Sequence, residues 1–201
     1  TGIHNRERLF SHRLIEAFMV RANEAVAEFL ARKKIPFLYR VHPAPSTDKL
    51  KTLYQTLRAS DAKLPLPRAA HTEDPAWIAP VLEAAAGSSQ EFLVNRMVLR
   101  SMMQARYSPE KDGHFGLASG CYCHFTSPIR RYADLVNHRA LRYAIGLVDT
   151  PLPSADSLLE TAEQCNKRER TAANAEREID RRMACLLLRD RTGELFEGII
   201  S

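Results

Sequence analysis

The chain has 201 residues, of which 45% are hydrophobic and 26% are charged, so it can bury a core and is not a disordered polymer. Its formal net charge of +5 permits an anionic partner without requiring one. The 4 cysteines are too few for a disulfide scaffold, and no signal peptide or apolar run of membrane-spanning length is present. We therefore expect a cytoplasmic protein without a membrane segment.

Hydrophobic periodicity predicts a largely helical first half. Apolar residues from Ile15 through Phe18 and Met19 to Leu30 recur at helical spacing and are expected to face a core. Pro36 stops that helix, and Ser46 is placed to cap the next one. In chain order the expected elements are a helix over residues 8–34, a strand over 37–42, a helix from 47, a proline-rich loop over 61–75, and helices over 76–86 and 89–106.

The second half predicts one short extended region and two further helices. Residues 107–123 contain Pro109 and several glycines, with Phe115 and Leu117 alternating, which favours a strand pair or a strand with a turn. A helix is expected over 128–145 and a long, charged, solvent-exposed helix over 154–189. A new strand begins near Glu194. The fold class is therefore α+β, predominantly helical, with helices packed on short strands.

The stretch HFTSPIRRY, residues 124–132, places two cations where a helix is expected to begin. Thr126 or Ser127 suits the N-cap and Pro128 suits the first helical position. Arg130 and Arg131 would then face the positive end of the helix dipole, at a cost of about 0.3–1 kcal/mol each. A bound phosphate would reverse the sign of both contributions. The alternative is a pair of surface salt bridges from these arginines to the nearby Asp134.

Three further sets of polar residues are candidates for a site. On the helix after the arginines, Asp134 and Asn137 fall on one stripe, while Ile129, Tyr132 and Ala133 are expected on the core side. On the first helix, Glu16 and Asn23 share a face, although each taken singly is typical of a solvated residue. Cys121 and Cys123 are adjacent to His124, but no second pair of ligands completes a zinc site, so we interpret them as reduced, half-buried thiols.

Taken together, these motifs resemble the RNB family of exoribonucleases, of the ribonuclease II and ribonuclease R type. The resemblance rests on Tyr107-Ser108-Pro109, on GHFGLAS over 113–119, and on HFTSPIRRYADLVNHR over 124–139. It extends upstream through residues 12–30 and downstream through AEREID over 175–180 and GELFEGIIS over 193–201. It implies that residues 1–192 are the C-terminal portion of an RNB catalytic domain. Residues 193–201 would begin an OB-type RNA-binding domain.

The resemblance also implies an activity and a set of site residues. RNB enzymes are hydrolytic, processive 3′-to-5′ exoribonucleases that use Mg²⁺ and release 5′-nucleoside monophosphates from single-stranded RNA. By motif, Arg130 would be catalytic and stabilise the charge of the scissile phosphate. Glu16 would lie near the ribose of the 3′-terminal nucleotide. The full set of implied RNA-binding residues is Glu16, Asn23, His124, Ser127, Arg131 and Tyr132.

Two departures from the family pattern limit this expectation. Ala17 follows Glu16 where the family has a second acidic residue, and the family's cluster of metal-binding aspartates has no counterpart. The Mg²⁺ ligands are therefore expected outside this chain, which alone would be inactive and would leave strand edges over 37–42 and 115–118 exposed. The alternative function is a catalytically inactive RNA-binding protein with an RNB-type fold. Either protein could also act within a larger RNA-degradation complex.

Overall fold

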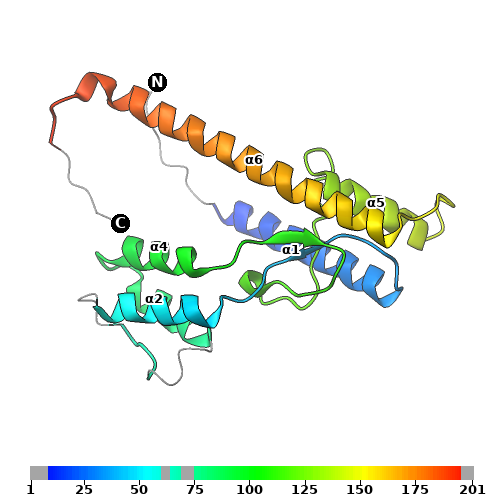
Figure 1. Ribbon diagram of the computed structural model, residues 1–201, viewed down its shortest axis with the longest axis horizontal. Helices are drawn as coiled ribbons and strands as arrows, with labels where there is room; N and C mark the ends of the chain where they lie inside the picture. Colours follow the sequence, from blue (N-terminus) through cyan, green and yellow to red (C-terminus); the bar gives the residue numbers. More distant parts are fainter. Residues whose placement is uncertain (1–8, 60–63, 69–74, 196–201) are drawn as a thin grey trace. The chain divides into compact units, whose positions relative to one another are not determined.

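The structure is a computed structural model that describes residues 9–59, 64–68 and 75–195 (Figure 1). It is predominantly helical with a two-stranded sheet, which confirms the predicted fold class. The elements are α1 Phe10–Arg32, β1 Tyr39–Val41, α2 Thr47–Ala59, η2 Pro75–Trp77, α3 Ile78–Ala85, α4 Glu91–Ser101, β2 Arg106–Ser108, η3 Phe115–Leu117, α5 Tyr132–Ala144, α6 Ala155–Leu188 and η4 Arg189–Arg191.

The elements form two compact units, and the first contains every residue of the candidate site. It consists of the chain up to His42 together with Ala105–Arg177. Here α1 contacts α5, and the N-terminal part of α6 lies beside α5 (Figure 1). Burial of apolar side chains in two adjoining clusters holds these elements together. The clusters are Ala27, Leu30, Phe37, Cys121, Cys123 and Ala140, and Leu38, Tyr107, Ala133, Val136, Leu158 and Ala162.

Both edges of the small sheet are occupied, so the expectation of exposed strand edges was wrong. β1 and β2 are antiparallel, with Arg40 opposite Tyr107. On the far side of β1, the Arg40 N–H donates to the Tyr122 carbonyl at 2.9 Å and the His42 N–H donates to the Gly113 carbonyl at 3.0 Å. On the far side of β2, the side-chain amide of Asn166 pairs with both backbone groups of Tyr107, at 2.7 and 3.0 Å.

The segment around Phe115 is a single 3-10 turn rather than the predicted strand. The Ala118 N–H donates to the Phe115 carbonyl at 2.9 Å, and Ala118 itself adopts the left-handed conformation with φ 50°. Strand pairing cannot continue through a left-handed residue, because its backbone groups no longer project to the sides of an extended chain. The turn instead returns the chain so that His114 and Ser119 face each other.

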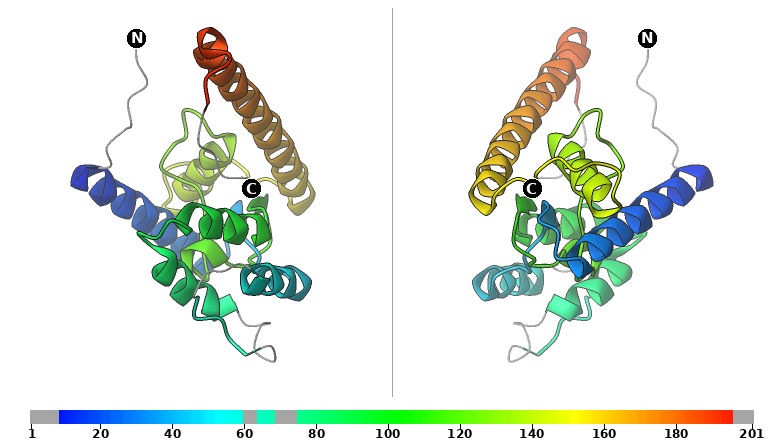
Figure 2. Two further views of the ribbon diagram at one scale, coloured as in Figure 1. Left: turned by 90° about the vertical axis from the view of Figure 1, so that its left-hand side faces the viewer. Right: turned by 90° about the vertical axis from the view of Figure 1, so that its right-hand side faces the viewer.

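The second unit contains Pro43–Gln104, in which α2, α3 and α4 enclose an apolar core of their own (Figure 2). Its buried residues include Leu50, Leu53, Leu57, Trp77, Val81 and Val94. The Ser46 hydroxyl accepts the N–H of Lys49 at 3.4 Å, as expected of a capping residue. Helix α4 ends at Ser101, earlier than predicted, because Met102 is extended and residues 106–108 pair with β1. Of the predicted loop over 61–75, residues 64–68 lack regular structure and most of the remainder lies outside the described residues.

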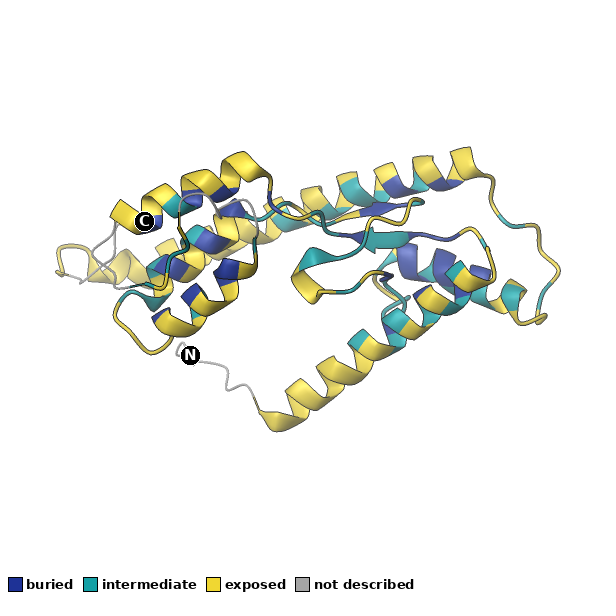
Figure 3. Cartoon of the chain, turned by 90° about the horizontal axis from the view of Figure 1, so that it is seen from below, coloured by how far each residue is buried: buried dark blue, intermediate teal, exposed yellow. Residues whose placement is uncertain are grey.

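The two longest helices differ from expectation in opposite ways. The predicted core stripe of α1 is wrong in its first half, because Phe18 is 64% exposed and Ile15 is 56% exposed, with no described element covering them. Both views in Figure 2 show this blue end of α1 extending away from its neighbours. The prediction for α6 is confirmed, since only Leu158 and Ala162 are buried and the helix is largely solvent-exposed (Figure 3). Glu194 and Leu195 are not in a strand, and the rest of the predicted C-terminal strand lies outside the described residues.

No helix within the described ranges is long and apolar enough to cross a membrane.

Candidate functional site

The segment before α5 is a turn, so the prediction that this helix starts at Pro128 was wrong. The Ser127 carbonyl accepts the backbone N–H groups of Arg130 at 3.3 Å and Arg131 at 3.2 Å. Arg131 is extended, with φ −125° and ψ 115°, and occupies the N-cap position, so the first helical residue is Tyr132. Neither arginine therefore lies within the first turn of the helix, and the dipole penalty expected from the sequence does not arise in that form.

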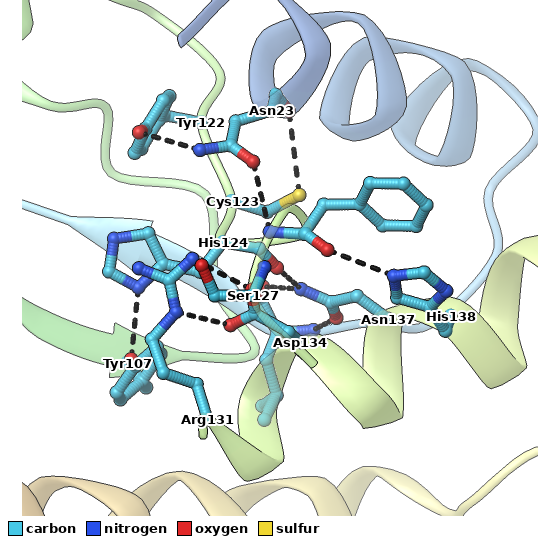
Figure 4. Close-up of polar contacts among 12 residues, drawn as sticks. Asn23, Tyr107, Tyr122, Cys123, His124, Ser127, Arg131, Asp134, Asn137 and His138 are labelled. Atoms are coloured by element: carbon cyan, nitrogen blue, oxygen red, sulfur yellow. Dashed lines mark hydrogen bonds and ion pairs between the residues drawn. The ribbon is translucent and has the colours of Figure 1, made fainter. Parts of the chain in front are cut away.

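Arg131 forms a bidentate ion pair with Asp134, the third residue of α5 (Figure 4). Its Nε and Nη2 atoms donate to the two carboxylate oxygens at 2.8 and 2.7 Å, and the Ser127 N–H donates to the same carboxylate at 2.8 Å. The Asp134 side chain is 0% exposed and that of Arg131 is 19% exposed. The salt bridge expected at the surface is thus present for Arg131 but is buried at its acidic end.

Arg130 has the opposite environment. Its side chain is exposed, and its guanidinium forms no hydrogen bond or ion pair with any residue in the described part of the chain. It lies on the wall of a groove of about 940 Å³ between the α5 turn and α6. Other residues on this groove are Tyr107, Arg131, Tyr132, Gln164, Arg168, Glu169 and Glu176.

The contribution of α6 to this groove was missed by sequence reasoning. The charged pattern of residues 154–189 indicated only a solvated helix, and no local signal distinguishes Arg168 from the other arginines of α6. Like Arg130, Arg168 is exposed and its guanidinium has no partner among the residues that the structure describes. Glu169, by contrast, accepts a hydrogen bond from the Arg40 guanidinium at 2.7 Å. The groove therefore presents two guanidinium groups without an ion-pair partner among the described residues, together with the exposed carboxylate of Glu176, and such guanidinium groups can bind a phosphate.

Asn137 joins α5 to the chain segments on either side of the site. Its side-chain oxygen accepts the Leu38 N–H, and its amide nitrogen donates to the carbonyls of Leu38 and His124, each at 2.9 Å. The predicted polar stripe is thus buried, because the Asp134 and Asn137 side chains are both 0% exposed. Ile129 and Tyr132, predicted on the core side, are instead 100% and 55% exposed. The predicted helical spacing of the residues on α5 was correct, but the buried face of this helix also includes the polar residues Asp134 and Asn137.

Asn23 performs a similar function for α1. Its amide nitrogen donates to the Tyr122 hydroxyl at 2.9 Å, and its side-chain oxygen accepts the Phe125 N–H at 3.0 Å. The side chain is 3% exposed, whereas Glu16, two turns earlier in α1, is exposed. The structure therefore places Asn23 beside the motif residues, and its polar groups are engaged by the protein itself. Phe125 is further held by His138, whose ring stacks on it and whose Nε2–H donates to its carbonyl at 2.9 Å.

His124 is uncharged at neutral pH. Burial lowers the pKa of its imidazole to about 3, and the nearby positive charges of Arg131 and Arg40 act in the same direction. Its Nδ1 atom lies 2.9 Å from the Tyr107 hydroxyl. Burial raises the pKa of Tyr107 to about 12, so this hydroxyl remains protonated. An uncharged pair next to the arginines avoids adding a third cation and helps to hold the motif against β2.

The cysteines do not form a reactive centre. Cys121 and Cys123 are buried, free thiols, and burial raises the pKa of both, so neither is an activated thiolate. Across the described ranges, no group of three or more His, Cys, Asp or Glu side chains could hold a metal ion. The carboxylates nearest the arginines are already engaged, Asp134 by Arg131 and Glu169 by Arg40.

Comparison with known proteins places this geometry in a family. The model of the RNB domain family matches residues 1–146. Ribonuclease R 1 of Lactococcus lactis is 38% identical over 203 residues, which is 99% of this chain and 24% of that protein. The chain thus spans about a quarter of the length of this relative.

Solved structures agree with the sequence comparison. RNase R of Mycoplasma genitalium in complex with double-stranded RNA matches with a TM-score of 0.76 and 34% identity, over 94% of this chain and 34% of that one. The same protein in complex with ribose-methylated single-stranded RNA matches with a TM-score of 0.70 and 34% identity, over 90% of this chain and 29% of that one.

Proposed function

The chain belongs to the RNB domain family, and on that premise we propose that it is the RNA-binding, phosphate-stabilising part of a hydrolytic exoribonuclease. The enzyme would degrade single-stranded RNA processively from the 3′ end and release 5′-nucleoside monophosphates. The observation that carries this proposal is the exposed guanidinium of Arg130, which has no described partner and lies on a groove of about 940 Å³. The RNA complexes of the similar RNase R support the choice of ligand.

Arg130 is the residue that we propose to be catalytic. When water attacks a phosphodiester and the bond to the upstream 3′ oxygen breaks, negative charge is spread over the non-bridging oxygens. A guanidinium already free of intramolecular partners can donate two N–H groups to those oxygens without first breaking a salt bridge. Such a donor stabilises the transition state more than the bound substrate, so it raises the turnover rate rather than the affinity.

The remaining groove residues would bind the strand. Arg168 can neutralise a neighbouring phosphate, and the exposed ring of Tyr132 can stack on a base, an interaction that tolerates any sequence. We propose that Ser127, at the start of the turn that precedes α5, and His124, three residues earlier, line the path of the strand beside Arg130. We propose that Glu16, which is exposed on α1, accepts a hydrogen bond from a ribose 2′-hydroxyl near the 3′ end.

Mg²⁺ is the cofactor that the family implies, and the side chains described here do not fit it. Mg²⁺ requires carboxylate oxygens that converge in near-octahedral geometry. No suitable cluster occurs in the described ranges, and Asp134 and Glu169 are committed to arginines. We therefore propose that the metal ligands belong to other parts of a longer protein. The 201-residue chain alone would then bind RNA without degrading it.

The test is a kinetic comparison in the full-length protein that carries this chain. With a 5′-labelled single-stranded RNA, the wild-type protein should shorten the substrate from its 3′ end and release mononucleotides. Arg130→Ala should lower kcat by about 10²-fold or more, while the Kd for RNA changes by less than about tenfold. Arg130→Lys should restore little, since an ammonium does not reproduce the bidentate fork.

The matched control is Arg142→Ala, which removes another exposed arginine, from the far end of α5. It should leave kcat and Kd close to wild type. Equal losses in binding and turnover for Arg130→Ala would show that Arg130 only positions the strand. RNA binding by the wild-type protein without any release of nucleotides would instead support the inactive RNA-binding protein.

A further inference from the structure

The adjacent arginines of the motif occupy two different environments. Arg130 is exposed and its guanidinium has no partner within the described residues. Arg131 is mostly buried and uses both Nε and Nη2 on one carboxylate, at 2.8 and 2.7 Å. By sequence alone they are two equivalent cations, and the family resemblance assigns an RNA contact to each. The geometry distinguishes them.

We propose that Asp134 is a positioning residue that acts through Arg131 and Ser127 to fix the turn carrying Arg130. In this arrangement Arg131 belongs to the scaffold and is not a phosphate contact. The inference rests on the proposed function, because it assigns the catalytic contact to Arg130 alone. Asp134 never touches RNA in this scheme, since its side chain is 0% exposed.

The first argument is electrostatic. If Arg131 turned toward a phosphate, the buried carboxylate of Asp134 would keep only the Ser127 N–H as a donor. A buried charge deprived of its counter-ion is strongly unfavourable, so the pair resists being opened by a ligand. An ion pair between Arg131 and a solvent-exposed, hydrated phosphate is weaker than its ion pair with the desolvated carboxylate of Asp134 at 2.7 Å. Arg131 is therefore expected to remain on Asp134 when RNA binds.

The second argument concerns the turn itself. The backbone of Ser127 is held at both ends, because its N–H donates to Asp134 and its carbonyl accepts from the N–H groups of Arg130 and Arg131. The Arg131 side chain closes a further ring from the end of the turn back to the same carboxylate (Figure 4). Asp134 is also favourably placed for a negative charge, in the first turn of α5. One carboxylate thus fixes the backbone on both sides of Arg130 while leaving its side chain free.

The experiment compares charge-removing variants of all three residues in the full-length protein. The variants are Arg130→Gln, Arg131→Gln, Asp134→Asn and the double variant Arg131→Gln/Asp134→Asn. The controls are Arg142→Gln and Asp180→Asn, which alter exposed residues of α5 and α6. Two quantities are measured on a single-stranded RNA: kcat with KM, and the slope of log affinity against log salt concentration.

Arg130→Gln should reduce the magnitude of the salt slope by about 0.7, the value for one lost phosphate contact on a single strand. Arg131→Gln should leave the slope unchanged but lower kcat by about ten- to a hundredfold at similar KM, because a catalytic group is misplaced. Asp134→Asn should lower kcat to a similar extent. The double variant should lose no more than the worse single variant, since both changes disable one unit.

A fall in the salt slope for Arg131→Gln equal to that for Arg130→Gln would overturn the inference, as would independent, multiplicative losses in the double variant. Should Asp134→Asn fail to fold, Arg131→Lys takes its place, because it keeps the charge while losing the bidentate pair. Wild-type kcat for Arg131→Lys would contradict the scaffold role. An inactive wild-type protein would refute the proposed function instead, so the two failures give different results.

Discussion

Replacing Asn137 by alanine should cost the first unit a large part of its stability. The substitution removes three hydrogen bonds, each of 2.9 Å, to the Leu38 N–H and to the carbonyls of Leu38 and His124. A typical neutral hydrogen bond contributes about 1 kcal/mol, and buried groups that lose a partner add a desolvation cost. With the small cavity included, the free energy of unfolding should fall by about 3 to 5 kcal/mol.

This loss is measurable by thermal unfolding of the 201-residue chain, followed by circular dichroism. For a protein of 150–250 residues, 1 kcal/mol shifts Tm by about 2–4 °C, so Tm should fall by roughly 6 to 20 °C. Asn174→Ala is the control, because Asn174 is exposed on α6, and it should change the stability by less than about 0.5 kcal/mol.

A second variant separates the hydrogen bonds from the cavity. Asn137→Asp keeps the volume and can still accept the Leu38 N–H, but it sets an oxygen against the carbonyls of Leu38 and His124. It should therefore destabilise the protein at pH 7 at least as much as Asn137→Ala. The reasoning is refuted if Asn137→Asp is harmless, since the cavity would then account for the whole effect. It is equally refuted if Asn137→Ala behaves like Asn174→Ala.

Two further predictions concern His124 and Glu16. Burial lowers the folded-state pKa of His124 to about 3. Below pH 6.5 the unfolded chain therefore binds a proton that the folded chain does not, so the free energy of unfolding should decrease as the pH decreases. From pH 7 to 5 this group alone should account for about 2 kcal/mol, a dependence that His124→Gln should remove in denaturation series at both pH values. Glu16→Ala should weaken the preference of the full-length protein for RNA over an oligonucleotide ending in 2′-deoxyribose, measured as a ratio of Kd values, without lowering Tm. An unchanged ratio would return Glu16 to the class of solvated surface residues.

Local sequence rules predicted most elements because those elements depend on short-range patterns. Helix α1 ends at Arg32, shortly before Pro36, Ser46 caps α2, and the charged repeat of α6 is solvated as expected. The errors occur where a distant segment decides the outcome. Helix α4 stops early because residues 106–108 pair with β1, some 65 residues away in the chain. The apolar residues Ile15 and Phe18 follow a core pattern, yet no described segment covers them.

The start of α5 shows why a site is harder to predict than an element. The capping rules favoured a helix from Pro128, with Thr126 or Ser127 as its cap, because they consider only the residues next to the cap. They do not include the competing bond from the Ser127 N–H to the buried carboxylate of Asp134, which holds residues 127–131 as a turn. The turn leaves Arg131 at the N-cap position, and a separate ion pair with the same carboxylate compensates its charge. Of the two cations that the sequence placed at a helix terminus, only Arg130 is left without a partner among the described residues.

The groove extends this argument beyond the motif. Arg130 and Arg168 are separated by 38 positions, on a turn and on a long helix, and neither has a described partner. Glu176 lies on the same groove, yet no ion pair among the described residues joins it to either guanidinium, whereas Arg131 and Arg40 are each paired with a carboxylate. Leaving two cations unpaired on one groove while pairing the arginines beside them is the pattern expected where the missing counter-ion is the ligand. For a strand of RNA, that counter-ion is its phosphate backbone.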